Sequence, residues 1–421
     1  MKSTRQKADT ELVRRQNRSL VLESLRRSGP LASIELGEVT NLSPATISAI
    51  TNDMLNERLI EADREETDKH RQTQRGRPKV KLKLCADAAL VLGIEVTHNA
   101  LRFLCADYMG VVHIRATVST ESARLSAVAF TKLLIDNVKA FLRTHDISPK
   151  RVSVACITCQ GSVDARTGEL IWSPAFHAKN IQIAAPLTEE FNFRVIVAND
   201  TNAIAHALNT ERSDKRGSFA ALYLSSGIGL GLFVNGRLLE GSHGSASEFG
   251  HMLWKADGAL CRCGRRGCIE AYASDFGIYR SANPELADTH PSEITPTAKD
   301  MADLVKRAET GDVLARQAFE IAGQALGAGL TNLIMLVNPQ EVLLTGPGRS
   351  YFHLMEPGMR SVLNHVSDRG VTDKIDILAD ERNLAEIGLL SMAYTCLDTD
   401  VFASRVSVAD MAARHKPAEM V

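Results

Sequence analysis

The spacing of apolar residues at the start of the chain predicts three helices. An apolar face between Val21 and Leu25 fits a first helix, which Gly29-Pro30 ends. A short second helix follows, with Leu36 and Val39 facing inward. It ends at Asn41, because asparagine tolerates the left-handed backbone that a tight turn needs.

The third helix lies in the stretch LSPATISAITNDMLNERLI, residues 42–60. Ser43 is a good N-cap, and Pro44 suits the first helical position. The inward stripe consists of Ile47, Ile50 and Met54. The opposite face carries small or polar side chains. Two helices joined by a short turn, the second with such an outer face, are typical of a helix-turn-helix, whose second helix enters the major groove of DNA.

A basic strand follows these helices. In RGRPKVKLKL, residues 75–84, apolar side chains alternate with lysines, which predicts a half-buried strand with Val80, Leu82 and Leu84 inward. Arg75 and Arg77 lie on the preceding turn, where guanidinium groups suit phosphates or a narrow minor groove. Residues 1–84 are therefore predicted to form a winged helix-turn-helix DNA-binding domain. A three-helix protein-interaction module with a basic hairpin is the alternative.

From about Leu90, strands and helices alternate. Strands are expected at residues 90–96, 101–107, 111–118, 151–157, 219–226, 229–239 and 341–346, with a helix over 123–144 and a long helix before the last strand. Two strand-rich, helix-covered halves predict an α/β body of two lobes with a cleft between them, over residues 85–400. Residues 401–421 are expected to form a loosely attached tail.

Composition is typical of a soluble intracellular protein. Hydrophobic residues make up 44% of 421 residues, enough for large cores, and no apolar run suggests a signal peptide or a membrane span. Thiols stay reduced inside cells, so clustered cysteines favour metal binding over disulfides. Cys156 and Cys159 form a CxxC pair, but strand alternation points the two thiols to opposite faces, which argues against a redox role.

Charge is distributed unevenly along the chain. Residues 1–84 hold 17 Lys+Arg against 12 Asp+Glu, whereas the remainder holds 32 against 38. A basic unit on an acidic body predicts a polyanionic partner. Because one recognition helix covers few base pairs, we expect operator DNA with two-fold related half-sites and a homodimer or higher homo-oligomer. The base-reading candidates are Ser43, Thr46, Ser48 and Asn52, with Arg75 and Arg77 on the backbone or minor groove.

Three cysteines are packed into CRCGRRGC, residues 261–268. With the preceding histidine they give the spacing H-x9-C-x-C-x4-C. Three thiolates and one imidazole make a closed tetrahedral Zn²⁺ site of the structural type, one per chain, with the ligands His251, Cys261, Cys263 and Cys268. Gly264 and Gly267 allow the sharp turns that such a loop needs. Buried thiols with an unrelated histidine are the alternative.

The same residues carry a family resemblance. The stretch GSHGSASEFGHMLWKADGALCRCGRRGCIE, residues 241–270, resembles the signature of the ROK family, named for repressors, open reading frames and kinases. VANDTNAIAHA, SSGIGLGLFVNG and NPQEVLLTGPG match in order over nearly the whole body, and LSPATISAITNDML and GRP match the DNA-binding end of the family's regulators. The resemblance implies two actin-like (ribonuclease H-like) lobes of the sugar-kinase type, closing over a sugar, with the zinc loop shaping the pocket.

Carried over by motif, the resemblance implies that a sugar or sugar phosphate contacts Asn199, Asp200, Glu248, His251 and Glu270. Carboxylates and an amide can grip adjacent hydroxyls, and a buried site rejects ligands that lack them. His251 would bind zinc through one ring nitrogen and face the sugar with the other. Three alternatives stay open: His251 as a purely structural ligand, Asp200 as a helix cap, and Glu270 as a partner of nearby arginines.

The phosphate-binding side departs from the family's kinases. These resemble GIDIGGTK at the first strand turn, where glycines let the backbone approach ATP phosphates, whereas this chain has GIEVTHNA, with neither glycine in Glu95–Ala100. Ser225 and Ser226 replace the usual Gly-Thr, and Pro347 interrupts a nucleotide-side glycine run. We therefore predict a cytoplasmic, sugar-responsive repressor of carbohydrate-metabolism genes, with no enzymatic activity and no membrane partner. The alternatives are a sugar kinase that carries a DNA-binding domain and a sensor that mainly binds another protein.

Overall fold

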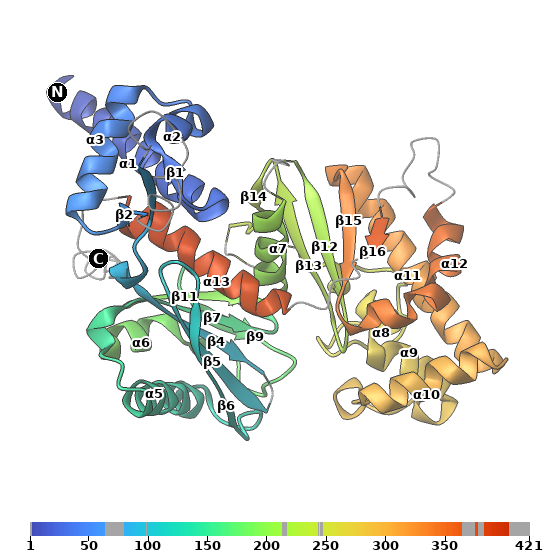
Figure 1. Ribbon diagram of the computed structural model, residues 1–421. Helices are drawn as coiled ribbons and strands as arrows, with labels where there is room; N and C mark the ends of the chain where they lie inside the picture. The colour runs from blue at the N-terminus through green and yellow to red at the C-terminus, as the bar shows by residue number, and fades with distance from the viewer. Residues whose placement is uncertain are drawn as a thin grey trace, which may run out of the picture.

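A computed structural model gives the fold of the chain (Figure 1). It describes residues 2–63, 80–97, 99–212, 217–242, 244, 247–363, 375–377 and 383–403. A small N-terminal unit comes first along the chain, and a larger body of two lobes follows it. The predicted α/β class is confirmed.

The N-terminal unit combines three helices with a three-stranded antiparallel sheet in the order β1-β3-β2. Its elements are α1 (Lys2–Ser28), β1 (Leu31–Ala32), α2 (Ser33–Thr40), α3 (Pro44–Asn56), β2 (Ile60–Ala62) and β3 (Lys81–Leu84). Asn41 ends α2 in the left-handed conformation (φ 56°), and the Ser43 hydroxyl accepts the Thr46 N–H to cap α3. The helix stripe predicted to face inward is buried, and it consists of Ile47, Ile50 and Met54.

Fewer residues of α2 and of the segment leading into β3 are buried than the apolar pattern predicts. Leu36 is buried, but Val39 is 48% exposed, because the two turns of α2 present only one residue to the core. Leu82 and Leu84 pack inward, whereas Val80 is 48% exposed. Val80 lies before β3, outside the ladder that this strand forms with β1 and β2.

The first lobe is built on a five-stranded sheet in the order β11-β7-β4-β5-β6. Its strands are β4 (Leu90–Val96), β5 (Ala100–Asp107), β6 (Val112–Ser119), β7 (Val152–Cys159) and β11 (Arg194–Asn199). One face is covered by α5 (Ala127–Thr144) and α6 (Ala184–Phe191). A smaller sheet consists of β8 (Ser162–Asp164), β9 (Glu169–Trp172) and β10 (Ile181–Gln182). Cys156 and Cys159 of β7 pack into cores on opposite faces, as predicted.

The second lobe repeats this topology with the order β14-β13-β12-β15-β16. In both sheets three strands pair antiparallel and two more add in parallel. The strands are β12 (Phe219–Leu224), β13 (Ile228–Val234), β14 (Arg237–Leu238), β15 (Glu341–Thr345) and β16 (Ile375–Ile377). The helices on one side are α8 (Glu270–Ala273), α9 (Asp275–Ala282), α10 (Ala298–Glu309), α11 (Val313–Val337) and α12 (Phe352–Leu363). The repeat confirms the predicted two-lobed body.

Two helices, α7 (Asp200–Glu211) and α13 (Leu384–Cys396), connect the lobes. Helix α7 packs on the second-lobe sheet, where Leu208 belongs to the same core as Phe233. Helix α13 packs on the first-lobe sheet, and Figure 1 shows it running from beside α7 toward the N-terminal unit. Gly388 of α13 lies against α7 so closely that a Cβ would come within 1.8 Å of the Ala203 carbonyl oxygen.

Arginines of α1 join the N-terminal unit to the body through hydrogen bonds, ion pairs and ring contacts. Asp398, in the helical turn η9 (Leu397–Val401), accepts two hydrogen bonds from Arg26 at 2.8 and 3.0 Å. The Arg26 guanidinium also stacks on the rings of Tyr108 and Tyr394. Further contacts run from Arg15 to Asp400 and from Arg18 to the Phe402 carbonyl oxygen. We call this contact the α1–η9 junction.

The predicted loose tail over residues 401–421 begins too early. Val401 and Ala403 are each 3% exposed, and the Phe402 ring packs edge-on to Tyr108 with centroids 5.1 Å apart. The chain is packed here because α13 returns to the N-terminal unit, a long-range contact that local composition does not reveal. Residues 404–421 lie outside the described residues.

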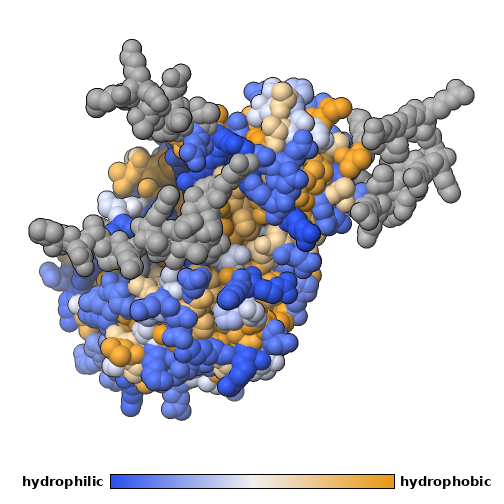
Figure 2. All heavy atoms as spheres, turned by 90° about the vertical axis from the view of Figure 1, so that its left-hand side faces the viewer, coloured by the Kyte–Doolittle hydropathy of each residue, from blue (hydrophilic) through white to orange (hydrophobic). Residues whose placement is uncertain are grey.

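Helix α11 is the one described helix that is long and apolar enough, by length and composition, to cross a membrane. It packs in the core of the second lobe, where Phe319, Leu326 and Leu330 are fully buried, as in the central helix of a globular domain. The face of the molecule that carries the N-terminal unit and α5 is mostly hydrophilic, with scattered apolar side chains (Figure 2).

Candidate sugar site and metal centre

A cavity lies between the two lobes at the N-terminal end of α7. The first lobe contributes Gln160, Ser162 and Trp172, and the second lobe contributes the turn after β12, the 3₁₀ helix η3 (Phe249–His251) and the start of α8. All five residues implied to contact a sugar line this one cavity: Asn199, Asp200, Glu248, His251 and Glu270. Residues from distant parts of the sequence thus meet at one point.

Asn199, and not Asp200, is the N-cap of α7. Its Oδ1 accepts the N–H groups of Thr201 at 2.8 Å and Asn202 at 3.2 Å. One of its two amide N–H groups donates to the Gly161 carbonyl oxygen at 2.8 Å, which leaves the other for a ligand. The alternative that Asp200 serves as the cap is therefore wrong; Asp200 is the first residue of the helix and lines the cavity.

Burial changes the acidity of Asp200. Loss of hydration raises its pKa to about 6, hydrogen bonds from Thr201 oppose the rise, and the negative charge of Glu95 adds to it. The group is thus mostly ionised at neutral pH and can accept a hydrogen bond from a ligand hydroxyl. A pKa this close to neutrality also suits a general base.

Glu270 is buried at the start of α8, with 7% of its surface exposed. Its Oε2 accepts the Ile228 N–H at 3.1 Å, and its Oε1 lies 3.6 Å from Cys261 Sγ. Arg262, one of three arginines in the cysteine loop, donates to the carbonyl oxygens of Ser226, Pro291 and Ile294. Burial lowers the pKa of Arg262 and the charge of Glu270 opposes this lowering in part, while no hydrogen bond or ion pair joins the two side chains among the described residues. Glu270 is therefore a charge partner of Arg262 at a distance and not a direct one.

His251 lies between the metal cluster and the cavity. Its Nδ1 is 3.7 Å from Cys261 Sγ, while its Nε2 is 3.9 Å from Glu248 Oε2. Partial burial and the charge of Glu270 raise the pKa of Glu248, against the effect of His251. The Trp172 ring meets the imidazole edge-on with centroids 5.7 Å apart. One imidazole nitrogen therefore faces sulfur and the other faces a cavity carboxylate.

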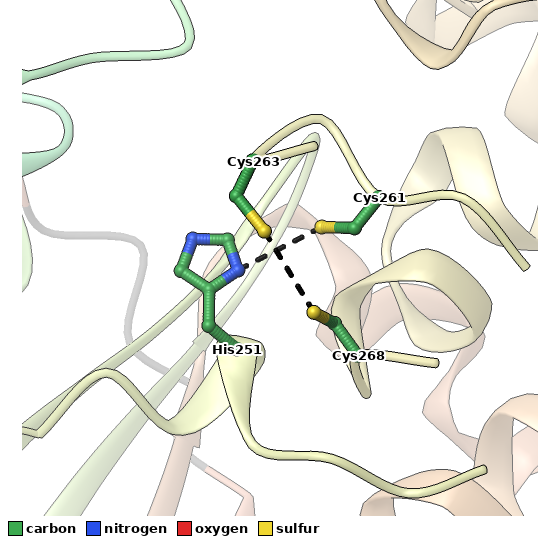
Figure 3. A group of neighbouring side chains, drawn as sticks. All are labelled: His251, Cys261, Cys263 and Cys268. Carbon is green, nitrogen blue, oxygen red and sulfur yellow. Dashed lines mark hydrogen bonds between the residues drawn. The ribbon is translucent and has the colours of Figure 1, made fainter. Parts of the chain in front are cut away.

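The four residues of the cysteine loop converge on one point (Figure 3). The ligand atoms of His251, Cys261, Cys263 and Cys268 all lie within 4.8 Å of one another. Cys263 Sγ and Cys268 Sγ are 3.7 Å apart. A tetrahedral Zn²⁺ with metal–sulfur bonds of about 2.3 Å needs sulfur–sulfur edges of about 3.7 Å. The donor set and its spacing therefore fit zinc.

The loop backbone is shaped for this convergence. Gly264 and Gly267 have φ values of 85° and 80°, as the predicted sharp turns require, and a Cβ on Gly267 would lie 1.8 Å from the Lys255 carbonyl oxygen. Burial raises the pKa of Cys261, and burial with the charge of Cys263 raises that of Cys268 to about 11. Binding of a metal cation requires that these thiols lose their protons, and the charge of the cation favours that loss.

Hydrogen bonds of the Thr97 side chain close the turn between β4 and β5. The Thr97 hydroxyl donates to the Ala100 carbonyl oxygen at 3.0 Å and accepts the Ala100 N–H at 3.1 Å. Glu95 pairs with Arg102 across the two strands at 3.0 Å. Glu95 also lies near enough to Asp200 for its negative charge to raise the pKa of that carboxyl. His98 lies outside the described residues.

The DNA-binding candidates lie on one helix as far as they are described. Ser43, Ser48 and Asn52 are exposed, and Thr46 is half-buried. The hydroxyls of Ser43 and Thr46 are 2.8 Å apart, so the N-cap uses part of their hydrogen-bonding capacity. Arg75 and Arg77 lie outside the described residues.

Sequence reasoning missed several cavity residues, including Gln160, Trp172 and Ser247. Trp172 sits in a short strand that was not predicted, and no motif marks Gln160. Ser247 adjoins the recognised Glu248, but its backbone conformation, with φ at 69°, could not be inferred from the residue type.

Comparison with known proteins assigns the chain to a family. The ROK family model matches residues 107–393, well over half of the chain, so this protein belongs to the ROK family. The xylose repressor of Bacillus spizizenii is 28% identical over 339 residues, covering 80% of this chain and 83% of that protein. The DNA-binding transcriptional dual regulator NagC of Escherichia coli is 23% identical over 382 residues, covering 89% and 90%.

Solved structures agree on the fold. A ROK family transcriptional regulator, described as a homolog of the E. coli MLC protein, has a TM-score of 0.76 at 23% identity and covers 94% of this chain and 99% of its own. The ROK hexokinase from Thermus thermophilus has a TM-score of 0.56 at 23% identity and covers 73% and 97%. These likenesses confirm the predicted actin-like, sugar-kinase-type fold of the body.

Proposed function

We propose that this protein is a DNA-binding transcriptional repressor whose DNA affinity responds to a sugar. The observation that carries the proposal is the convergence of Asn199, Asp200 and Glu270 with Glu248 and His251 on one cavity, in a chain whose N-terminal unit is firmly joined to the body. Relatives named xylose repressor, N-acetylglucosamine repressor and transcriptional repressor Mlc support the regulatory role. We propose that the protein acts in the cytoplasm and represses carbohydrate-metabolism genes.

The N-terminal unit is proposed to be a winged helix-turn-helix. Helix α3 begins after a left-handed residue, has a buried stripe, and leaves Ser48 and Asn52 exposed, as a recognition helix requires. Lys81 and Lys83 follow on β3, at the base of the segment proposed as the wing. Because one such unit reads few base pairs, a homodimer or higher homo-oligomer would bind two-fold related half-sites.

The charges of the cavity favour an uncharged sugar over a sugar phosphate. Its described lining contains three carboxylates, Asp200, Glu248 and Glu270, and no lysine or arginine. Glu95 contributes a further negative charge at Asp200. A phosphate dianion would therefore meet like charges, and no lysine or arginine of the described lining could pair with it.

The cysteine loop is proposed to hold one structural Zn²⁺ per chain, with His251, Cys261, Cys263 and Cys268 as ligands. All four positions of the tetrahedron are filled by protein atoms, so the ion would supply structure and no catalysis. Arg262 then ties the loop to the turn after β12 through the Ser226 carbonyl oxygen. The loop in this way supports both Glu270 and the floor of the cavity.

A sugar kinase with a DNA-binding domain is the alternative function. Asp200, with its pKa near 6, suits a general base, and kinases are among the solved relatives. Against it stands the turn at Glu95–Ala100, which lacks both glycines of the kinase motif and is closed by hydrogen bonds of Thr97. An ATP-coupled assay with each sugar that binds distinguishes the two functions, and we expect no phosphorylation.

Thermal-shift screening tests the proposed function directly. D-xylose, D-glucose and N-acetyl-D-glucosamine are compared with their phosphates, because a ligand that binds the folded state raises the melting temperature. We expect one uncharged sugar to stabilise the protein and to change its affinity for operator DNA. Stabilisation by ATP, or by none of these compounds, contradicts the proposal.

A further inference from the structure

Ser247 precedes the proposed sugar contact Glu248 and has an unusual backbone conformation. Its φ is 69°, in the left-handed region, where a Cβ is disfavoured and glycine is preferred. The turn that follows is fixed, because the Ser247 carbonyl oxygen accepts the Phe249 N–H at 2.7 Å around Glu248, where η3 begins. A side chain kept in such a conformation costs free energy, and this cost is most often found at functional sites.

The hydroxyl of Ser247 is the second unusual feature. Its Oγ is buried and has no hydrogen-bond partner among the described residues, a condition that it shares there only with Thr158. Thr158 lies within β7 and does not line the cavity, whereas Ser247 belongs to the lining, as His251 and Glu270 do. A buried hydroxyl without a partner is costly, so a ligand in the cavity is the natural partner.

We propose that Ser247 is a specificity-determining residue whose hydroxyl forms a hydrogen bond with one hydroxyl group of the bound sugar. This inference depends on the proposed sugar-sensing function and names a further contact of the same site. A serine hydroxyl both donates and accepts, as a sugar hydroxyl does. Glycine would relieve the backbone but supplies no hydroxyl, which accounts for a serine at a strained position. A deoxy sugar that lacks the matching group leaves Oγ unpaired, so the site rejects it.

Two variants separate the hydroxyl from the backbone strain. Ser247→Ala removes the hydroxyl and keeps the strain, whereas Ser247→Gly removes both. Ser242→Ala is the matched control, because Ser242 is exposed and does not line the cavity. The probes are D-xylose, D-glucose and N-acetyl-D-glucosamine, together with each monodeoxy analogue of the sugar that binds. Calorimetry gives the affinities, and thermal melting gives the stability of each unliganded variant.

Both Ser247 variants should melt at or above the parent temperature without ligand, because strain or an unpaired hydroxyl has been removed. Their sugar affinity should fall about three- to tenfold. They should also lose discrimination against a single deoxy analogue while keeping it against the others, and Ser242→Ala should match the parent.

Parent-like affinity and discrimination in both variants would overturn the inference. A lower melting temperature in both variants would overturn it as well, since the hydroxyl would then serve the fold. If the parent binds none of the three sugars, the proposed sugar-sensing function is contradicted, and this contact with it.

Discussion

The carboxyl group of Asp200 lines the cavity and lowers the stability of the folded protein at neutral pH. Burial raises the pKa of Asp200 to about 6, from an ordinary value of 3.8. The folded protein therefore binds more protons than the unfolded chain between these two pH values. The free energy of unfolding falls as the pH rises through this window and stays lower above it.

Replacement of Asp200 by asparagine should reverse this cost. At about pH 7.5, Asp200→Asn should stabilise the unliganded protein by up to ~3 kcal/mol, because a pKa shift of two units corresponds to that energy. The gain should shrink toward zero near pH 4, where the parent carboxyl is protonated. Denaturant unfolding of both proteins at the two pH values measures it, with the surface variant Asp136→Asn as control. The same gain at both pH values would contradict the assigned pKa.

At the scale of elements, the loop from His251 to Glu270 acts as one unit. Its four metal-ligand atoms lie within 4.8 Å of one another. In the same loop, Arg262 donates to the turn after β12, and Glu270 lines the cavity. Loss of the metal should therefore disorder a loop that supports the sugar site, and the effect should extend beyond the cluster itself.

Cys263→Ser should release the metal and abolish the response to sugar. Elemental analysis should find about one Zn²⁺ per parent chain and a strongly reduced content in the variant. Cys85→Ser is the matched control, because Cys85 is a free cysteine outside the cluster. Parent protein purified without zinc, or a Cys263→Ser variant that keeps both zinc and sugar response, would contradict the account.

Elements set by local chemistry could be predicted from the sequence, and those set by long-range packing could not. Capping at Ser43, the left-handed Asn41 and the glycine turns of the cysteine loop each depend on a residue's own preferences, and each was predicted. The packing of residues 401–403 and the exposure of Val39 depend on where distant segments meet. The family motifs named five cavity residues. Ser247 lies within the same stretch, residues 241–270, but its left-handed backbone could not be inferred from the residue type.

At the scale of the whole molecule, a continuous path of contacts joins the cavity to the N-terminal unit. Helix α7 begins at the cavity and packs on α13, and α13 leads into η9, which binds α1 through Asp398 and Arg26. Figure 1 shows α13 spanning this distance. A sugar that draws the lobes together would move α7 and α13 and thereby reorient the α1–η9 junction.

Asp398→Asn should uncouple the two ends of this path. Asp398 is 4% exposed and pairs with Arg26, so its neutralisation leaves a half-buried guanidinium without its counterion and should cost roughly 3 kcal/mol of stability. Sugar affinity should remain near that of the parent, while operator affinity should lose its dependence on sugar. Glu386→Gln, which removes the exposed pair with Arg115 at the other end of α13, should change stability by less than ~1 kcal/mol and keep the response. Retained coupling in Asp398→Asn would exclude the junction as the path.

A sugar-responsive repressor must bind sugar and operator DNA with linked free energies. The most direct test is the dissociation constant of the sugar found by thermal shift, measured on the free protein and again on the protein saturated with operator. A typical coupling of about 1–3 kcal/mol changes this constant by roughly 5- to 150-fold, and the sugar must change operator affinity by the same factor. We predict such a reciprocal change. Identical sugar affinity with and without operator would contradict a sugar-responsive repressor, however tightly each ligand binds.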